Sequence, residues 1–388
     1  MVFSVKTYNN INQIGLKELG NHFQIDGDLA KNPDAYIIRS QNLHDTVFPE
    51  NLKAIARAGA GTNNIPVDEA TEKGIVVFNT PGANANAVKE AVLASILLSA
   101  RDYIAANAWV NTLSGDDVPK QIEAGKKQFA GSEIAGKTLG VIGLGAIGVL
   151  VANVARHLGM DVYGVDPFLS VKNALSLSRD ITVVKSYDEL YEICDYITVH
   201  VPYIPDTKGM LNKEAFAKMK DGVVILNYAR DLLVNDEDMK AALESGKVAR
   251  YVTDFPNPAV MQMPHVIATP HLGASTAESE DNCAVMAAHE ISEFMENGNI
   301  INSVNYPNCD AGVCNTKGRI TVAHRNIPKM LNRFTEVLSD EGINIDHMTN
   351  KSRGDYSYCV FDIDSDSTQE IADKLNAIDG VLKVRVIK

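Results

Sequence analysis

The sequence is short of several features that mark whole classes of protein. It contains no apolar run of about 18 residues, the length that a membrane-spanning helix needs. Its first ten residues, MVFSVKTYNN, lack the charged start and the apolar run of a secretory signal. We therefore expect a cytoplasmic protein with no segment in a membrane.

Cysteine is scarce and scattered. The five cysteines are odd in number, and only Cys309 and Cys314 lie close together, with no second pair of ligands beside them. Zinc sites and disulfide frameworks use paired or clustered cysteines, so the pattern predicts neither. We expect reduced, buried thiols and no bound metal.

Positive charge is also in short supply. Lys and Arg total 36 against 49 Asp and Glu, which gives a formal net charge of −13. This balance argues against a general role at nucleic acids or membrane surfaces. It does not exclude a small anionic substrate, because a few arginines reverse the field inside a cleft.

The clearest positive signal is the stretch 139–166, in which an apolar strand leads into GLGAIG, a helical pattern and a second apolar strand. This order is typical of a dinucleotide-binding unit. Gly143 permits the tight turn, Gly145 lets the backbone approach a pyrophosphate, and Gly148 lets the helix pack closely on the strand.

The end of this stretch indicates which dinucleotide is bound. The amides at the helix start, including those of Ala146 and Ile147, and the positive end of the helix dipole face the phosphates. Asp166 follows 18 residues after Gly148. A carboxylate at this spacing bonds a ribose 2′-hydroxyl and repels a 2′-phosphate, so the sequence predicts NAD rather than NADP.

The 388 residues are too many for one ordinary domain. Strand and helix patterns alternate from 139 to 275, which predicts a parallel, doubly wound sheet with ligands at the carboxyl ends of its strands. Arg230, Asp254 and His271 each follow such a strand.

The flanking regions carry other patterns. Residues 1–92 alternate strands and helices without a phosphate fingerprint, which indicates a companion lobe. Apolar spacing predicts one long helix over 86–110, and 114–136 is predicted to be a loop or short helix. A further amphipathic helix spans 276–298 and ends at Gly298.

The C-terminal part restarts after a polar linker at 302–317. Residues 318–388 show the order βαββαβ, which predicts a separate module of ferredoxin-like fold.

Several motifs in order resemble the D-2-hydroxyacid dehydrogenase family over essentially the whole chain. They are RAGAGTNNI, FNTPGANANAVKE, GLGAIG, HVP, NYAR, TPHLGAST, HRNIP and GINI. The resemblance is strongest to the members that oxidise 3-phospho-D-glycerate and carry a C-terminal ACT domain. It implies an α/β fold with a doubly wound NAD domain (93–283) inserted into a flavodoxin-like substrate domain (1–92 and 284–308), followed by an ACT domain (318–388).

The family chemistry assigns roles to two residues. His271 matches the acid/base residue, and imidazole suits this role because it titrates near neutrality. Arg230 matches the arginine that clamps the substrate carboxylate, for which a planar guanidinium is suited. The resemblance implies NAD-dependent oxidation of 3-phospho-D-glycerate to 3-phosphohydroxypyruvate, at the start of L-serine biosynthesis.

The resemblance also implies binding residues. Besides the glycine-rich segment, those for the cofactor are His200, Val201, Pro202, Ala229, Asp254, Gly273 and Ala274. Those for the substrate, besides Arg230, are Arg39, Ser40, Arg57, Ala60, Gly61, Thr62 and Asn63.

Two departures from the family leave alternatives open. The family places a glutamate between the arginine and the histidine, and Ala259 stands roughly at that position. Asp231 follows Arg230 where the family has glycine, and it is expected to compete for the arginine's charge. The alternatives are a catalytically weak NAD-binding sensor or scaffold, or a reductase of another 2-hydroxy acid such as glycerate or glyoxylate.

In the C-terminal module, His324, Asn326 and Asn344 match residues that bind serine in regulated members of the family. Lys329 stands where ACT domains usually have glycine and is expected to fill the pocket. L-serine regulation and a pure oligomerisation role both remain open. By family analogy we expect a homo-oligomer, either a dimer or a tetramer.

Overall fold

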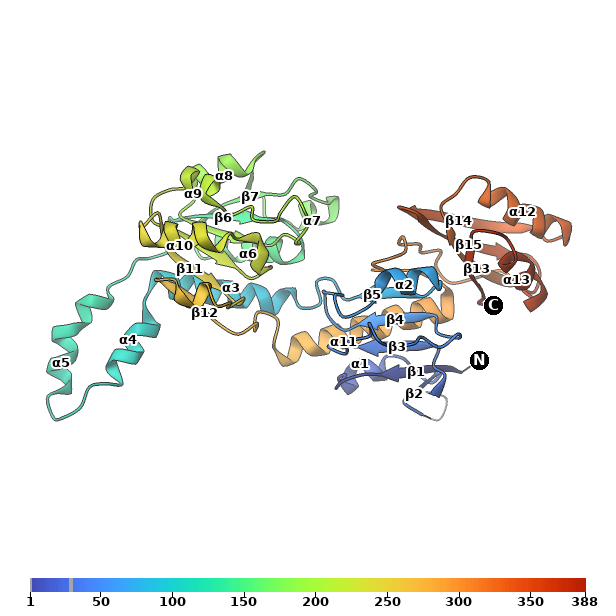
Figure 1. Cartoon of the computed structure of the whole chain (residues 1–388), viewed down its shortest axis with the longest axis horizontal. Helices are drawn as coiled ribbons and strands as arrows, with labels where there is room; N and C mark the ends of the chain where they lie inside the picture. The colour runs from blue at the N-terminus through green and yellow to red at the C-terminus, as the bar shows by residue number, and fades with distance from the viewer. Residues whose placement is uncertain (1, 28–30) are drawn as a thin grey trace. The chain divides into compact units, whose positions relative to one another are not determined.

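The computed structural model describes residues 2–27 and 31–388 (Figure 1). The chain divides into two compact units. Unit 1 comprises Met1–Asn84 with Ala277–Lys388, and unit 2 is Ala85–Thr276. The division falls at residues 85 and 276, whereas the sequence led us to expect 93 and 283.

Unit 2 is built on a seven-stranded parallel sheet in the order β12-β11-β10-β9-β6-β7-β8. Its strands are β6 (Thr138–Ile142), β7 (Asp161–Val165), β8 (Thr182–Val183), β9 (Tyr196–Val199), β10 (Val223–Asn227), β11 (Val248–Thr253) and β12 (Val266–Ala268). The chain runs from β6 outward to β8 and then crosses to β9, so a topological switch point lies between β6 and β9. This is the doubly wound sheet that the sequence predicts.

Helices cover both faces of this sheet. The α-helices of unit 2 are α3 (Ala85–Ala100), α4 (Tyr103–Val110), α5 (Val118–Gly125), α6 (Ala146–His157), α7 (Val171–Ser176), α8 (Tyr187–Ile193), α9 (Lys213–Lys218) and α10 (Asp236–Glu244). Short 3₁₀ helices are η2 (Lys126–Phe129), η3 (Asp231–Leu233) and η4 (Val260–Gln262). Helices α8, α9 and α10 pack in one apolar cluster with the sheet, and α3 and α6 pack in the other.

The expectation of one helix over 86–110 is wrong. The helix breaks between Ala100 and Tyr103, and the side chain of Asp102 accepts a hydrogen bond from the backbone N–H of Ala105. Asp102 is thus the N-cap of a new helix, because its carboxylate satisfies a donor that has no partner within the helix. Arg250 pairs with the same carboxylate at 3.3 Å, which ties the break to β11.

The first lobe of unit 1 is a five-stranded parallel sheet in the order β2-β1-β3-β4-β5, the flavodoxin-like order. Its strands are β1 (Phe3–Thr7), β2 (Phe23–Ile25), β3 (Ala35–Ile38), β4 (Ala54–Arg57) and β5 (Val76–Asn79), and its first two helices are α1 (Gln13–Lys17) and α2 (Val67–Glu72). Helix α11 (Ala277–Ser292) returns into the same core, which explains why the sequence pattern of this lobe resumes after the insert.

Helix α11 ends in a π-helical stretch, η5 (Glu293–Asn297). Gly298 closes it in the left-handed conformation, with φ of 72°, as the sequence predicts.

The C-terminal lobe of unit 1 has the predicted βαββαβ order. Its elements are β13 (Gly318–Arg325), α12 (Met330–Asp340), β14 (Ile345–Arg353), β15 (Tyr356–Ile363), α13 (Gln369–Asn376) and β16 (Val381–Val386). The strands form an antiparallel sheet in the order β14-β15-β13-β16. Both helices pack on one apolar cluster of this sheet.

Two buried arginines join this lobe to the end of η5. Arg385 donates to the backbone oxygens of Phe294 and Met295, at 2.9 and 3.1 Å. Arg319, which is fully buried and paired with Asp362, donates to the backbone oxygen of Asn297 at 2.9 Å. The last carbonyls of a helix have no partner within it, so these cations stabilise the helix end and hold the two lobes of unit 1 together.

Candidate active site

The functional residues predicted in unit 2 gather at one edge of its sheet. Each follows the carboxyl end of a strand, and those strands are neighbours. In sheet order, the residues at these ends are His271 after β12, Asp254 after β11, Arg230 after β10, His200 after β9, Gly143 after β6 and Asp166 after β7. Ligands of open α/β sheets bind at this edge, so the topology collects these side chains there.

The three glycines of GLGAIG are required for three different reasons. Gly143 has φ of +92°, and a Cβ there would lie 2.6 Å from the backbone oxygen of His200. A Cβ at Gly148 would lie 1.9 Å from the backbone oxygen of Gly143, so helix and turn touch. A Cβ at Gly145 would meet nothing within 4 Å. The space beside Gly145 is therefore open, as binding of a pyrophosphate requires.

The start of α6 faces this open space. The first hydrogen bond within the helix runs from the amide of Val149 to the backbone oxygen of Gly145. The amides of Ala146, Ile147 and Gly148 precede that bond, so they point out of the helix end. Together with the helix dipole they form an anion-binding end, and the residues present fit a dinucleotide phosphate.

Asp166 is held in place by the glycine-rich turn. One carboxylate oxygen accepts the backbone N–H of Leu144 at 2.9 Å, and the other accepts that of Phe168 at 2.8 Å. The carboxylate thus stands beside the turn at the end of β7, where the predicted ribose contact requires it.

His200, Val201 and Pro202 follow β9 next to the same turn. The ring nitrogen Nε2 of His200 lies 3.0 Å from Oγ1 of Thr198, while its buried Nδ1 has no partner among the described residues. Burial lowers the pKa of His200 to about 4, so the ring is neutral at physiological pH. A neutral ring does not repel or bind a phosphate by charge.

Arg230 extends from a turn that Asn227 organises. The buried side chain of Asn227 accepts the N–H of Ala229 at 3.1 Å and donates to the backbone oxygen of Arg230 at 2.8 Å. The exposed guanidinium of Arg230 touches the backbone oxygen of Ala229 at 2.5 Å. Sequence reasoning missed Asn227, although an Asn at the end of a buried strand is a turn signal.

The expected competition from Asp231 is not found. Its carboxylate accepts the N–H of Leu232 at 2.8 Å and begins η3. Within residues 2–27 and 31–388, no acidic side chain pairs with Arg230, so its charge is available to a ligand.

Asp254 is a buried carboxylate, only 1% exposed. Its Oδ2 accepts the backbone N–H of Gly273 at 3.0 Å, and its Oδ1 has no partner among the described residues. Burial raises the pKa of Asp254, and the Gly273 N–H with the charges of His271 and Arg230 opposes that rise. Asp254 therefore interacts electrostatically with both predicted catalytic residues.

His271 is exposed at the end of β12. Its ring packs on the ring of Phe255, with centroids 4.7 Å apart. The loop that follows is fixed at Gly273, where a Cβ would lie 2.9 Å from Oδ2 of Asp254. Ala274 follows and packs beside the α3/α6 cluster. The histidine thus stands on a fixed loop with its ring open to a ligand.

Ala259, at the position considered for the missing glutamate, is exposed and begins η4. The nearby Asn257 is engaged by its neighbours: its side chain accepts the N–H groups of Ala259 and Val260 and donates to Asp236. These contacts hold the turn that leads into η4. Asp254 is accordingly the carboxylate in this segment that interacts with His271.

Unit 1 carries the predicted substrate loop at the carboxyl end of β4. Within the described part of the chain, the backbone N–H groups of Ala60, Gly61, Thr62 and Asn63 donate no hydrogen bond. Side chains hold the loop from behind: Asn79 donates to the backbone oxygen of Ala60 at 2.5 Å, and His44 contacts that of Asn63 at 3.0 Å. Free amides on a fixed loop are suited to an anion.

The cations predicted for the phosphate end of the substrate already have partners. Arg39 pairs with Glu280 of α11 at 2.8 Å, and Arg57 donates to the backbone oxygen of Arg39 at 3.1 Å. The amide of Ser40 donates to Asn9. A phosphate at Arg39 thus has to compete with Glu280 for the guanidinium.

The predicted effector residues of the ACT-like lobe are largely engaged. His324 is 2% exposed, and its ring nitrogens contact the backbone oxygen of Arg325 and Oδ1 of Asn350. Asn326 donates to the backbone oxygen of Gly354, and the N–H of Asn344 donates to Asp364.

Lys329 has φ of +72°, the left-handed conformation that favours glycine. Lys329 thus occupies a backbone conformation that glycine adopts at lower cost.

Among the described residues, no group of three or more His, Cys, Asp or Glu side chains is arranged to hold a metal ion. None of the helices that the structure describes is long and apolar enough to cross a membrane. The five cysteines are all free thiols.

Two family models match the chain. The model described as "D-isomer specific 2-hydroxyacid dehydrogenase, NAD binding domain" matches residues 93–273, and that of the ACT domain matches residues 318–380.

The proteins to which the chain is similar include D-3-phosphoglycerate dehydrogenases. That of Haemophilus influenzae is 33% identical over 84% of this chain and 79% of its own length. That of Bacillus subtilis is 38% identical over 71% of this chain, but the match spans only about half (52%) of that longer protein. The solved structure of NAD⁺-bound 3-phosphoglycerate dehydrogenase from Entamoeba histolytica superposes with a TM-score of 0.61 and 26% identity, over 79% of this chain and 99% of that one.

Proposed function

We propose that this chain, which belongs to the D-isomer specific 2-hydroxyacid dehydrogenase family, oxidises 3-phospho-D-glycerate to 3-phosphohydroxypyruvate with NAD. The observation that carries the proposal is the cluster of Arg230, Asp254 and His271 at the ends of three adjacent strands, in the same sheet as the glycine-rich turn. The reaction is the one that begins L-serine biosynthesis.

Each step of the reaction is assigned to one group. NAD, held by the amides of Ala146, Ile147 and Gly148 and by Asp166, would supply the hydride acceptor for C2 of the substrate. His271 takes the proton from the C2 hydroxyl and returns it in the reverse direction. Arg230 binds the carboxylate and polarises the neighbouring oxygen, and the amides of Ala60–Asn63 are proposed to bind the substrate as well.

The family glutamate is missing, and we assign its electrostatic role to Asp254. An anionic carboxylate near His271 favours the imidazolium that forms when the ring takes the proton. Asp254 is buried, fixed by the N–H of Gly273 and interacts electrostatically with His271. It acts through His271 and is therefore a positioning residue.

A second candidate function is an NAD-binding sensor with weak turnover, which Ala259 at the family's glutamate position favours. The two functions predict different behaviour. A sensor binds NADH in a fluorescence titration and reduces no 2-oxo acid. The enzyme consumes NADH with phosphohydroxypyruvate, and turnover with hydroxypyruvate or glyoxylate alone would assign another 2-hydroxy acid.

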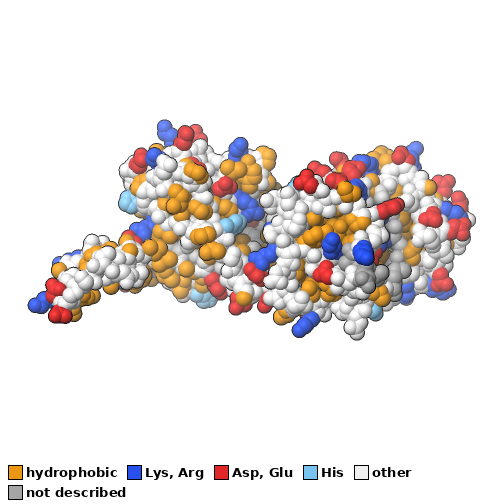
Figure 2. Space-filling view, turned by 60° about the horizontal axis from the view of Figure 1, so that its bottom comes forward, with side chains coloured by type: hydrophobic (Ala, Val, Ile, Leu, Met, Phe, Trp, Pro, Cys, Tyr) orange, Lys and Arg blue, Asp and Glu red, His pale blue; other side chains and the backbone are white. Residues whose placement is uncertain are grey.

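We also propose that the chain assembles into a homo-oligomer. Helices α4 and α5 have no buried residue, and Tyr103, Ile104 and Val110 of α4 are exposed. Figure 1 shows both helices running away from the sheet of unit 2, and Figure 2 shows hydrophobic side chains on this arm and at its base. An exposed apolar arm is typical of a subunit interface.

We place the enzyme in the cytoplasm, since all five of its thiols are free. We keep L-serine as the candidate effector of the ACT domain. Because the ring of His324 already contacts Asn350, we expect the effect of L-serine on the enzyme to depend on Asn344 rather than on His324. The initial rate measured with and without L-serine tests this.

A further inference from the structure

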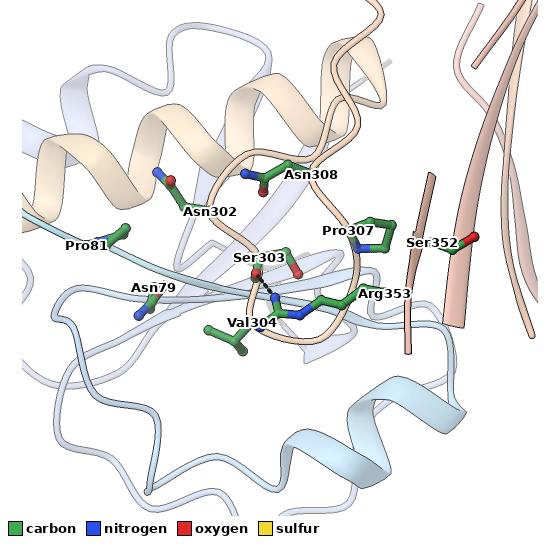
Figure 3. A pocket seen from close by; sticks show the side chains of 9 residues that line it. All are labelled: Asn79, Pro81, Asn302, Ser303, Val304, Pro307, Asn308, Ser352 and Arg353. Carbon is green, nitrogen blue, oxygen red and sulfur yellow. Dashed lines mark hydrogen bonds between the residues drawn. The ribbon is translucent and has the colours of Figure 1, made fainter. Parts of the chain in front are cut away.

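Unit 1 contains a groove of about 480 Å³ at the carboxyl end of β5 (Figure 3). Three segments line it: the end of β5, the connector 302–308, and the end of β14 in the ACT lobe. The polar residues that matter for its chemistry are Asn79, Asn302, Ser303, Asn308, Ser352 and Arg353. None of the three predicted effector residues lines this groove, although the lining residue Ser352 lies 3.5 Å from Oδ1 of Asn326. The groove plays no part in the mechanism above.

Arg353 gives the groove its charge. Its Nη1 donates to the backbone oxygen of Ser303 at 2.8 Å, as the dashed line in Figure 3 shows. In the described part of the chain, its Nε and Nη2 have no hydrogen-bond partner, and no acidic residue lines the groove. One guanidinium with free donors matches one carboxylate of a ligand.

The other polar groups favour a ligand that bears hydroxyls. The side-chain amide of Asn308 makes no hydrogen bond within residues 2–27 and 31–388, and an amide both donates and accepts. Hydroxyl groups need that combination. The lining contains no acidic side chain that could pair with an ammonium group, which favours a hydroxy acid over an amino acid.

The groove is connected to the substrate loop by hydrogen bonds. The connector pairs with β5 through an antiparallel bridge between Ser303 and Phe78. Asn79, which follows Phe78 and lines the groove, donates from its side chain to the backbone oxygen of Ala60 at 2.5 Å. A shift of Asn79 on ligand binding therefore moves the carbonyl that sets the position of the Ala60–Asn63 amides.

Asn302 is the second point of contact with the core. Its backbone is left-handed, with φ of 60°, and its side chain donates to the buried carboxyl of Glu290 on α11 at 2.8 Å. The groove wall is thus anchored both to the loop at β4 and to the helix α11.

We propose that this groove binds a small hydroxycarboxylate anion through Arg353 and Asn308, and that binding alters the Ala60–Asn63 loop through Asn79. The coupling rests on the substrate-binding role proposed for that loop, whereas binding in the groove does not depend on it. The ACT lobe then contributes a binding site at its junction with the substrate lobe.

The test uses the full chain with Arg230→Gln, which removes the carboxylate clamp of the candidate active site. Isothermal titration with D-glycerate is expected to retain one binding event. Arg353→Gln in that background is expected to weaken it at least tenfold, and so is Asn308→Leu, which leaves the Arg353–Ser303 bond intact. Arg333→Gln, an exposed arginine of the same lobe, is the matched control and is expected to leave it unchanged.

Hydrogen exchange at the backbone amides of residues 60–63 measures the coupling between the groove and this loop, and it requires no catalytic turnover. Addition of D-glycerate is expected to slow that exchange, and Arg353→Gln is expected to abolish the effect. The proposal is overturned if Arg230→Gln alone removes all binding, if binding survives both groove variants, or if inorganic phosphate binds more tightly than D-glycerate. Each of these outcomes leaves the proposed dehydrogenase activity standing, because that activity is measured separately.

Discussion

The carboxylate of Asp254 accepts the backbone N–H of Gly273 at 3.0 Å, and Gly273 lies two residues after His271. This bond joins the end of β11 to the loop that carries the histidine. It also leaves the second oxygen of Asp254 buried without a partner in the described residues. A buried carboxyl group with one oxygen unpaired is costly, which makes Asp254 a candidate for a role in the site.

Replacing Asp254 with asparagine tests that role. The amide oxygen still accepts the N–H of Gly273, so the loop keeps its shape while the charge disappears. We expect kcat to fall, by roughly tenfold to a hundredfold, because imidazolium loses an anionic neighbour. The pH profile of kcat/KM is expected to differ from that of the parent chain, because the variant removes a titratable carboxyl group from the site. An unchanged profile would make Asp254 purely structural.

The variant Ala259→Glu tests the alternative that the missing family glutamate limits catalysis. Ala259 is exposed, so a glutamate fits without a clash. If Asp254 already supplies the charge, the new carboxylate adds little, and we expect kcat to stay within about twofold of the parent value. A large rise in kcat would show instead that the absent glutamate limits the enzyme.

Two variants of the glycine-rich turn are expected to separate cofactor binding from the stability of the fold. Gly145 has φ of −76° and open space beside it, so Gly145→Ala is expected to fold normally and to lose NADH affinity at least tenfold. Gly148→Ala is expected to lose stability, by about 1–3 kcal/mol, because its Cβ meets the backbone oxygen of Gly143. Fluorescence titration with NADH and thermal unfolding of both variants check the contrast.

Glu290 predicts a pH dependence of stability. Burial raises its pKa to about 8 from an ordinary value of 4.5, so the folded chain holds the proton more tightly than the unfolded chain does. The contribution of Glu290 to the free energy of unfolding is then fully present below pH 4.5. It is lost as the pH rises towards about 8, by at most about 1.4 kcal/mol per pH unit.

The variant Glu290→Gln removes that titration. We expect its free energy of unfolding to exceed that of the parent at pH 8 and to match it at pH 5, as measured by denaturant unfolding. Glu278→Gln, an exposed glutamate of the same helix, is the control and should behave like the parent at both pH values. Equal stability of parent and Glu290→Gln at pH 8 would contradict the account of Glu290.

The fold was largely predictable because its signals are local. The strand before Gly143, the glycine spacing and the βαββαβ order of residues 318–388 are periodic patterns, and the structure confirms them. The long helix at 86–110 was wrong because apolar spacing continues through Asp102, whose capping bond to Ala105 breaks the helix. One capping residue thus ended the helix although the apolar spacing continued past it.

The sequence predicted which residues form the candidate site, but it did not predict the hydrogen-bond partners of those residues. Position along the chain placed Arg230, Asp254 and His271 at strand ends. It could not show that Asp231 turns to the N–H of Leu232, or that Asn79 reaches Ala60, because such contacts depend on loop geometry. The groove beside Arg353 is likewise formed by segments far apart in sequence, so no local pattern marks it.

The most direct test of the central claim is the rate of NADH consumption with phosphohydroxypyruvate, measured for the parent chain and for His271→Ala. The parent is expected to turn over, and His271→Ala is expected to be slower by roughly 10²–10⁴-fold with NADH affinity nearly unchanged. A parent chain that binds NADH but reduces no 2-oxo acid would contradict the claim, and so would a His271→Ala variant that retains full rate.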